Sequence, residues 1–242
     1  MSLAGLCFDA TGTLIETAEP VGEVYRRIAL QHGIDLPAWR LQDAFSRVLR
    51  HAPERGTEGN DPEARRRSEL DWWSELVRQT FQATDSTALF DDFRAFARDL
   101  FEAYRSADAW RTRAGVRTAL AALHQRGWPM AVVSNFDHRL LDILQLLDIS
   151  RFFRISILPF EIGRAKPDRA LFTSAAQALE TPIETLGYVG DDAPETLAAI
   201  ADLGIRVFDA REIERWSEWA EALGSPATLR ATPVEKPRAH PR

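Results

Sequence analysis

The sequence predicts an α/β fold: a doubly wound, Rossmann-like parallel sheet with an inserted helical bundle. Three observations predict it. Five short apolar runs have the length of strands, helical patterns connect the later runs, and about 90 residues of helical pattern separate the first run from the second. Such an interval is too long for an ordinary crossover connection. The insert therefore forms a separate helical unit.

The apolar runs cover residues 3–8, 129–133, 154–158, 186–189 and 205–208. Each is bounded by turn residues, and nearly continuous apolar character is typical of strands buried on both faces of a parallel sheet. Helical patterns at 137–147, 169–179 and 194–203 connect the later strands, and another at 116–125 precedes the second. Asp137 and His138 are expected at the start of their helix. The crossovers should be right-handed.

The insert contains four amphipathic segments, at residues 21–32, 41–49, 69–81 and 90–104. In the third, Trp73, Val77 and Phe81 recur at helical spacing and predict a buried face. Residues 51–67 are polar and contain Gly and Pro, so they are expected to form a loop in which the run Arg65–Arg67 is solvated.

The pattern divides the chain into three parts. Residues 1–16 and 107–224 are expected to form the Rossmann-like core, and residues 17–106 the helical insert. Residues 225–242 contain four prolines and little apolar content, so a disordered tail is expected there.

Composition narrows the class of protein. The formal charge of −6 argues against a general nucleic-acid binder, and no apolar run is long enough to cross a membrane. Cys7 is the only cysteine, so no intramolecular disulfide can form. This fits a cytoplasmic protein, in which Cys7 is buried in the first strand. A small-molecule partner is expected, and the sequence does not define an oligomeric state.

Polar residues gather where the predicted strands end, which is where ligands bind in such sheets. The segments are Asp9-Ala10-Thr11-Gly12, Ser134-Asn135, Lys166 before the helix at 169–179, and Gly190-Asp191-Asp192. Each residue alone is more often a turn or cap residue. Four such segments at one sheet edge indicate a site. Lys166 is also one of only two lysines among 30 basic residues.

In order and spacing, these segments resemble the four motifs of the haloacid dehalogenase superfamily of hydrolases, over about residues 3–210. The insert resembles the helical cap of one branch, and the first motif has the form Asp9-x-Thr11. The resemblance implies that Asp9 is a nucleophile and that Ser134 and Lys166 bind the phosphoryl group.

The same resemblance implies roles for the neighbouring residues. Asn135 would orient the site, and Gly12 would let the backbone pass closely beneath the phosphate. Asp9, Asp191 and the Thr11 carbonyl would hold Mg²⁺, a cation that prefers oxygen ligands. Positive charge is needed because a carboxylate that attacks a phosphoryl group faces anion–anion repulsion.

Two positions depart from the family pattern. Thr11 stands where phosphatases of the superfamily usually have an Asp that acts as general acid and base, and a hydroxyl is a poor proton shuttle. Thr196 stands where a further acid is often found after Asp191, and the sequence does not decide whether Asp192 or Glu195 takes its place.

We therefore expect a Mg²⁺-dependent phosphatase that acts on a small phosphorylated substrate through an aspartyl phosphate, slowly because of Thr11. The alternative is a catalytically impaired protein that binds a phosphorylated ligand or protein partner. The dehalogenase branch generally has an aromatic residue at the position of Thr11. The phosphonate-cleaving branch typically has Ala there and an additional cap lysine, whereas residues 17–106 contain no lysine.

Overall fold

A five-stranded parallel sheet forms the centre of the computed structural model, which describes residues 2–53, 59 and 61–226. The strand order is β5-β4-β1-β6-β7. The strands are β1 (Gly5–Phe8), β4 (Met130–Val133), β5 (Ile155–Ile157), β6 (Leu186–Gly190) and β7 (Arg206–Asp209). All five predicted strands are confirmed to within two residues at each end. Because the chain winds outward from β1 in both directions, the winding reverses at the carboxyl end of β1.

Helices cover both faces of this sheet, as its continuous apolar strands require. Leu6 and Phe8 of β1 pack toward α5 (Val116–Gln125), α6 (Arg139–Leu146) and α10 (Trp216–Ala222). On the opposite face, Cys7 and Tyr188 pack toward α8 (Arg169–Ala178) and α9 (Pro194–Asp202). The alternation along β1 thus assigns consecutive residues to two separate cores.

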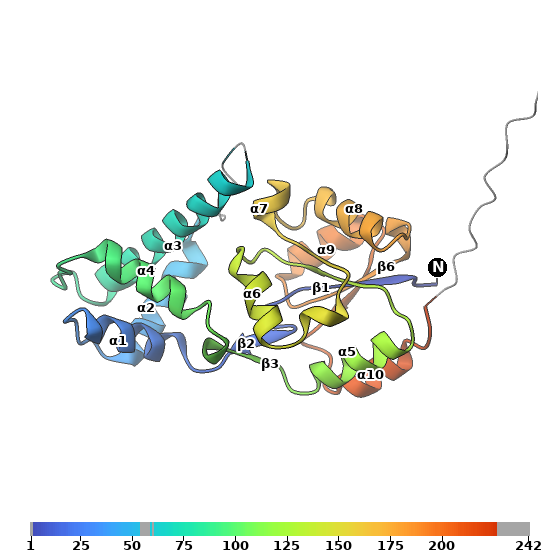
Figure 1. Ribbon diagram of the computed structural model, residues 1–242, viewed down its shortest axis with the longest axis horizontal. Helices are drawn as coiled ribbons and strands as arrows, with labels where there is room; N and C mark the ends of the chain where they lie inside the picture. Colours follow the sequence, from blue (N-terminus) through green and yellow to red (C-terminus); the bar gives the residue numbers. More distant parts are fainter. Residues whose placement is uncertain (1, 54–58, 60, 227–242) are drawn as a thin grey trace, which may run out of the picture.

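The insert is a bundle of four helices that lies beside the sheet domain (Figure 1). Its helices are α1 (Val21–Gln31), α2 (Ala38–His51), α3 (Pro62–Thr84) and α4 (Phe93–Ala103). Their buried faces share one apolar core, to which Val24, Val77, Phe81 and Leu100 contribute. The predicted helical insert is confirmed.

A short antiparallel ribbon joins the insert to the sheet domain and was not predicted. It pairs β2 (Ile15–Thr17) with β3 (Trp110–Thr112). Three residues are too few to show a strand periodicity in the sequence. The ribbon brings the two ends of the insert together.

The expected loop at residues 51–67 is wrong at both ends. Helix α2 continues through His51, and α3 already begins at Pro62. The Asp61 side chain accepts a hydrogen bond from the Ala64 backbone N–H at 2.8 Å, and Pro62 takes the first helical position, so both residues favour this start. Residues 54–58 and 60 of that loop, and residues 227–242 of the expected tail, lie outside the described residues.

Several short elements complete the fold. They are α7 (Pro159–Ile162) and the 3-10 turns η1 (Ala107–Ala109), η2 (Ser150–Phe152) and η3 (Ile183–Thr185). The unpredicted helix α10 packs on the sheet domain, where Trp128 Nε1 donates to the Gly224 carbonyl at 2.9 Å. Within the described ranges, no helix has the length and hydropathy that a membrane crossing requires.

The position of Cys7 gives a direct test of the fold. Cys7 is completely buried in β1, and burial raises the pKa of its thiol to about 12. We expect no reaction with an aromatic disulfide reagent at pH 8 in the native protein and complete reaction in guanidinium chloride. The variant Ser217→Cys, at an exposed position of α10, should react in the native state. Native reactivity of Cys7 equal to that of the control would contradict the placement of β1.

Candidate active site

The predicted site residues meet at the carboxyl ends of three adjacent strands. Asp9 follows β1, Ser134 follows β4 and Asp191 follows β6, and the sheet order is β4-β1-β6. Lys166 comes from the segment between α7 and α8 and reaches the same edge, where it contacts Asp9. Asp9, Ser134 and Lys166 also line one cavity of about 350 Å³.

Lys166 is the most highly connected of these side chains. Its Nζ lies 2.7 Å from Asp9 Oδ1 and 2.8 Å from Asp192 Oδ1, and it donates to the Tyr188 hydroxyl at 2.5 Å. The lysine side chain is only 1% exposed. Asn135 fixes its backbone through two hydrogen bonds, since Oδ1 accepts from the Lys166 N–H at 2.7 Å and Nδ2 donates to the Lys166 carbonyl at 3.2 Å.

Burial and charge act in opposite directions on this cluster. Burial raises the pKa of Asp9 above its ordinary value, while Lys166 and a hydrogen bond with Ser134 favour the ionised carboxylate. For Lys166, burial lowers the pKa, but Asp9 and Asp192 outweigh this effect and hold the pKa above its ordinary value. Lys166 therefore remains a cation, and it provides the positive charge beside Asp9.

The loop after Asp9 passes directly under Asp191. Gly12 has a φ of +80°, and a Cβ atom there would lie 2.0 Å from Asp191 Oδ2. Only glycine fits both the backbone conformation and the space. The Thr13 hydroxyl donates to Asp191 Oδ1 at 2.8 Å, and the Arg113 guanidinium donates to the Gly12 carbonyl. The loop thus positions Asp191 against the residues that follow Asp9.

The oxygen donors at this edge suit a hard divalent cation such as Mg²⁺. The described residues contain no group of three or more His, Cys, Asp or Glu side chains placed to hold a metal ion. Mg²⁺ needs no such group, because it is commonly bound by one or two carboxylates together with waters and substrate phosphate. Asp9, Asp191 and the Thr11 carbonyl are donors of this kind, so the residues present fit the ion.

The sequence left open whether Asp192 or Glu195 completes the metal site in place of the acid that is missing at Thr196. Asp192 lines the cavity, and its Oδ2 accepts from the Tyr188 hydroxyl at 2.5 Å in addition to its ion pair with Lys166. Glu195 is exposed in the first turn of α9 and is absent from the cavity lining. The structure therefore places Asp192 at Lys166. Thr11 lines the cavity as well.

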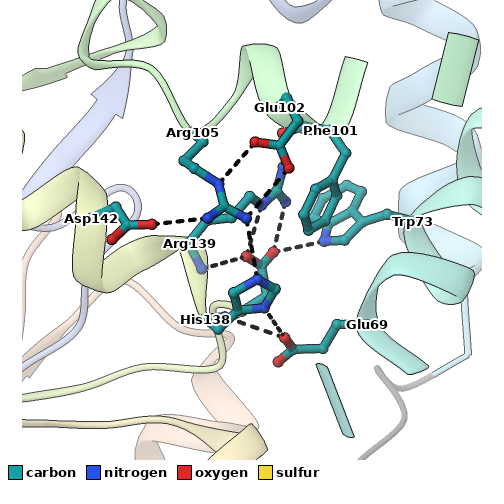
Figure 2. A network of polar contacts seen from close by, with 9 residues as sticks. Glu69, Trp73, Phe101, Glu102, Arg105, His138, Arg139 and Asp142 are labelled. Carbon is teal, nitrogen blue, oxygen red and sulfur yellow. Dashed lines mark hydrogen bonds and ion pairs between the residues drawn. The ribbon is translucent and has the colours of Figure 1, made fainter. Parts of the chain in front are cut away.

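A polar network holds the insert against the sheet domain (Figure 2). From α3, Glu69 Oε2 lies 2.7 Å from His138 Nδ1, and Trp73 Nε1 donates to Asp137 Oδ2 at 2.7 Å. Arg139 forms a two-point ion pair with Asp137 and donates to the Phe101 carbonyl at 2.8 Å. Its guanidinium also lies 3.6 Å from the centre of the Phe101 ring. These contacts hold the helical insert against the sheet domain at the cavity, which Trp73, Phe101 and Arg139 line.

Comparisons with known proteins agree with this fold. The model of the haloacid dehalogenase-like hydrolase family matches residues 3–204. The chain belongs to this family. It is 31% identical over 193 residues to haloacid dehalogenase-like hydrolase domain-containing protein 3 of Mus musculus, which covers 77% of this chain and 73% of the mouse protein. The protein is therefore a haloacid dehalogenase-like hydrolase, in a family that typically depends on Mg²⁺.

Solved structures of a phosphatase and of a dehalogenase share the fold of this haloacid dehalogenase-like hydrolase. A HAD phosphatase of Thermococcus onnurineus matches with a TM-score of 0.62 and 17% identity, over 93% of this chain and all of that one. The L-2-haloacid dehalogenase of Xanthobacter autotrophicus matches equally well, with a TM-score of 0.62 and 16% identity, over 85% and 76%. At these identities the likeness shows the fold and does not choose between the two reactions.

Some contacts of the hydrolase were missed or misjudged from sequence. The helix expected from residue 137 begins at Arg139, with His138 as its N-cap residue and Asp137 before it, and both residues also bind the insert. The expectation that Arg65 lies on a solvated face is wrong, because its Nη1 donates to the carbonyls of Phe160 and Glu161 at 3.1 Å. The hydroxyl of Tyr188 contacts Lys166, but in the sequence Tyr188 is indistinguishable from an ordinary strand residue. Nothing in one sequence shows which residues meet across the two parts of the chain.

Removing the buried cation should destabilise the fold. In Lys166→Met, Asp9 and Asp192 lose the positive charge between them, and breaking such a buried pair costs about 3 kcal/mol in the free energy of unfolding. Urea denaturation measures the difference. Arg164→Met is the matched control, since its side chain is 69% exposed in the same segment, and it should change stability by less than about 0.5 kcal/mol. Equal midpoints for the two variants would contradict the role given to Lys166.

Proposed function

We propose that this hydrolase is a phosphatase that cleaves a small phosphate monoester through an aspartyl phosphate on Asp9. One observation carries the proposal: a buried carboxylate faces a cavity, and a buried lysine cation and a serine hydroxyl lie beside it. A carboxylate nucleophile needs positive charge and hydrogen-bond donors around the group that it attacks. Lys166 and Ser134 meet this need.

In the first step, a carboxylate oxygen of Asp9 attacks phosphorus, the bond from phosphorus to the alcohol oxygen breaks, and the leaving oxygen takes up a proton from water, because Thr11 cannot act as the acid. The ammonium of Lys166 reduces the repulsion between the carboxylate and the phosphoryl oxygens. The Ser134 hydroxyl donates to one of those oxygens. Because Asn135 fixes the backbone of Lys166, the charge is positioned before the substrate binds.

Asp9, Asp191 and the Thr11 carbonyl would hold Mg²⁺, which supplies further positive charge against the phosphoryl oxygens when it is bound. The close approach of Asp191 to Gly12 supports this set, since it brings the second carboxylate to the loop that carries the carbonyl. This set is the basis of the expected Mg²⁺ dependence.

In the second step, water attacks phosphorus and releases Asp9, and here the chain lacks an acid–base side chain at position 11. Thr11 has no carboxylate to accept the proton of the water. Asp192 lines the cavity, but it is already bound to Lys166 and Tyr188 and so serves as the counterion of the lysine. The second step should therefore be slow, and the phosphorylated enzyme should accumulate.

The primary test is phosphate release from p-nitrophenyl phosphate, with Mg²⁺ or with a chelator, by the wild type and by Asp9→Asn. We expect release that requires both Mg²⁺ and Asp9, with the variant slower by at least about 10³-fold. Thermal denaturation establishes that Asp9→Asn is folded. Absence of phosphate release by folded wild type would contradict the proposal. A phosphorylated ligand that still binds would then favour the alternative, a non-catalytic binding protein, and halide release from a 2-haloacid would favour a dehalogenase.

Restoring a carboxylate at position 11 should accelerate the second step. In Thr11→Asp, the new side chain can take the proton from the attacking water, so the steady-state rate should rise by about 10²-fold. In the control variant Thr11→Asn, the side chain has the same shape as Asp but no carboxylate, so the second step should remain slow. Rapid-quench kinetics should show a burst of nitrophenol in the wild type and no burst in Thr11→Asp. An Asp variant no faster than the Asn variant would contradict the role given to position 11.

A further inference from the structure

The part of the cavity that lies beyond Asp9 and Lys166 has mainly apolar walls. All four helices of the insert contribute to it. The side chains are Val21 and Tyr25 of α1, Phe45 of α2, Val77 of α3, and Leu100 and Phe101 of α4. Trp110 and Phe136 of the sheet domain line the same space. A substrate whose phosphate lies against Asp9 therefore places its organic group among aromatic and aliphatic side chains.

In the part of the lining beyond Asp9 and Lys166, Arg139 is the charged side chain, and its charge is already neutralised. Arg139 directs Nε and Nη2 to the two oxygens of Asp137, at 2.8 and 2.7 Å, and Nη1 to the Phe101 carbonyl. A second anionic group on the substrate would have to compete with Asp137 for this cation. Trp73, which also lines the cavity, directs its indole N–H to Asp137 as well. The geometry thus offers little to a substrate with a carboxylate at its far end.

The organic group of a sugar phosphate would find few hydrogen-bond partners on these walls. Each hydroxyl that leaves water needs a new hydrogen-bond partner, and one that lacks a partner weakens binding about tenfold. Apart from Arg139 and Trp73, the insert-facing part of the lining offers only the hydroxyls of Thr17, Tyr25 and Tyr104. An apolar group needs no such partners, and it gains free energy from every methylene that it buries.

We propose that this cavity takes the alkyl or aryl group of a phosphate monoester, so that the substrate is the phosphate of a small hydrophobic alcohol or phenol. The inference rests on the proposed phosphatase function. The volume of about 350 Å³ lies near the lower end of the range for small-molecule sites. It suits one ring or a short chain, and it is small for a long lipid chain or a peptide.

A series of primary alkyl phosphates tests this specificity, because the leaving alcohols have similar reactivity. With Mg²⁺, kcat/KM is measured for methyl, propyl and hexyl phosphate, and for glycerol 3-phosphate and glucose 6-phosphate. We expect kcat/KM to rise about threefold to fourfold per methylene along the alkyl series. Hexyl phosphate should exceed glucose 6-phosphate by at least about 100-fold.

Two phenylalanines of the insert provide matched variants. Phe45 and Phe93 are both partly buried against the insert core, but only Phe45 lines the cavity. In Phe45→Ala, the ratio of kcat/KM for hexyl phosphate to that for methyl phosphate should fall about tenfold. Phe93→Ala should keep the wild-type ratio. Equal ratios in the two variants would overturn the assignment of this wall.

The outcomes separate this inference from the proposed function. A flat alkyl series, or glucose 6-phosphate hydrolysed faster than hexyl phosphate, overturns the inference and leaves the phosphatase standing. If no ester is hydrolysed, the phosphatase fails, and the affinities of hexylphosphonate and methylphosphonate, measured by calorimetry with Mg²⁺, decide the inference. Tighter binding of the hexyl compound supports the apolar site, and equal affinity overturns it.

Discussion

The burial of one ammonium group sets the arrangement of the site. Lys166 is almost fully enclosed, so its charge has to be met by the carboxylates of Asp9 and Asp192 and by the hydroxyl of Tyr188. Asp9 follows β1 and Asp192 follows β6, and the two strands are neighbours in the sheet. The strand order therefore supplies the two counterions, and the lysine in turn holds Asp9 beside a positive charge. In the proposed phosphatase, stability and catalysis depend on the same contacts.

A second buried ion pair holds the insert against the sheet domain. Asp137 and Arg139 are both buried, and together they bind Trp73 of α3 and the Phe101 carbonyl of α4. The Asp137 carboxylate and the Phe101 carbonyl already bind the Arg139 guanidinium. Arg139 therefore lines the cavity without offering a free charge to the substrate. The cavity thus divides into a polar end, where we propose that the phosphate binds, and an apolar end, to which we assign the organic group.

Local patterns were enough to predict the sheet, the insert and the motif residues at the strand ends. The strands are continuous apolar runs, and Asp9, Ser134 and Asp191 stand directly after three of them, whereas Lys166 precedes α8. Contacts between distant segments carry no local signal. The ion pair of Lys166 with Asp192, the binding of Trp73 to Asp137 and the ribbon of β2 with β3 each join residues that are 26 or more positions apart. Only the three-dimensional structure shows these contacts.

The central claim is that Asp9 itself becomes phosphorylated, and chemical trapping tests it most directly. Borohydride reduces an aspartyl phosphate to homoserine, so the wild type is mixed with substrate and Mg²⁺, quenched with borohydride and digested for peptide mass spectrometry. The account predicts homoserine at position 9, dependent on both substrate and Mg²⁺ and enriched because Thr11 slows hydrolysis. Phosphate on another residue, or turnover with position 9 unmodified, would contradict it.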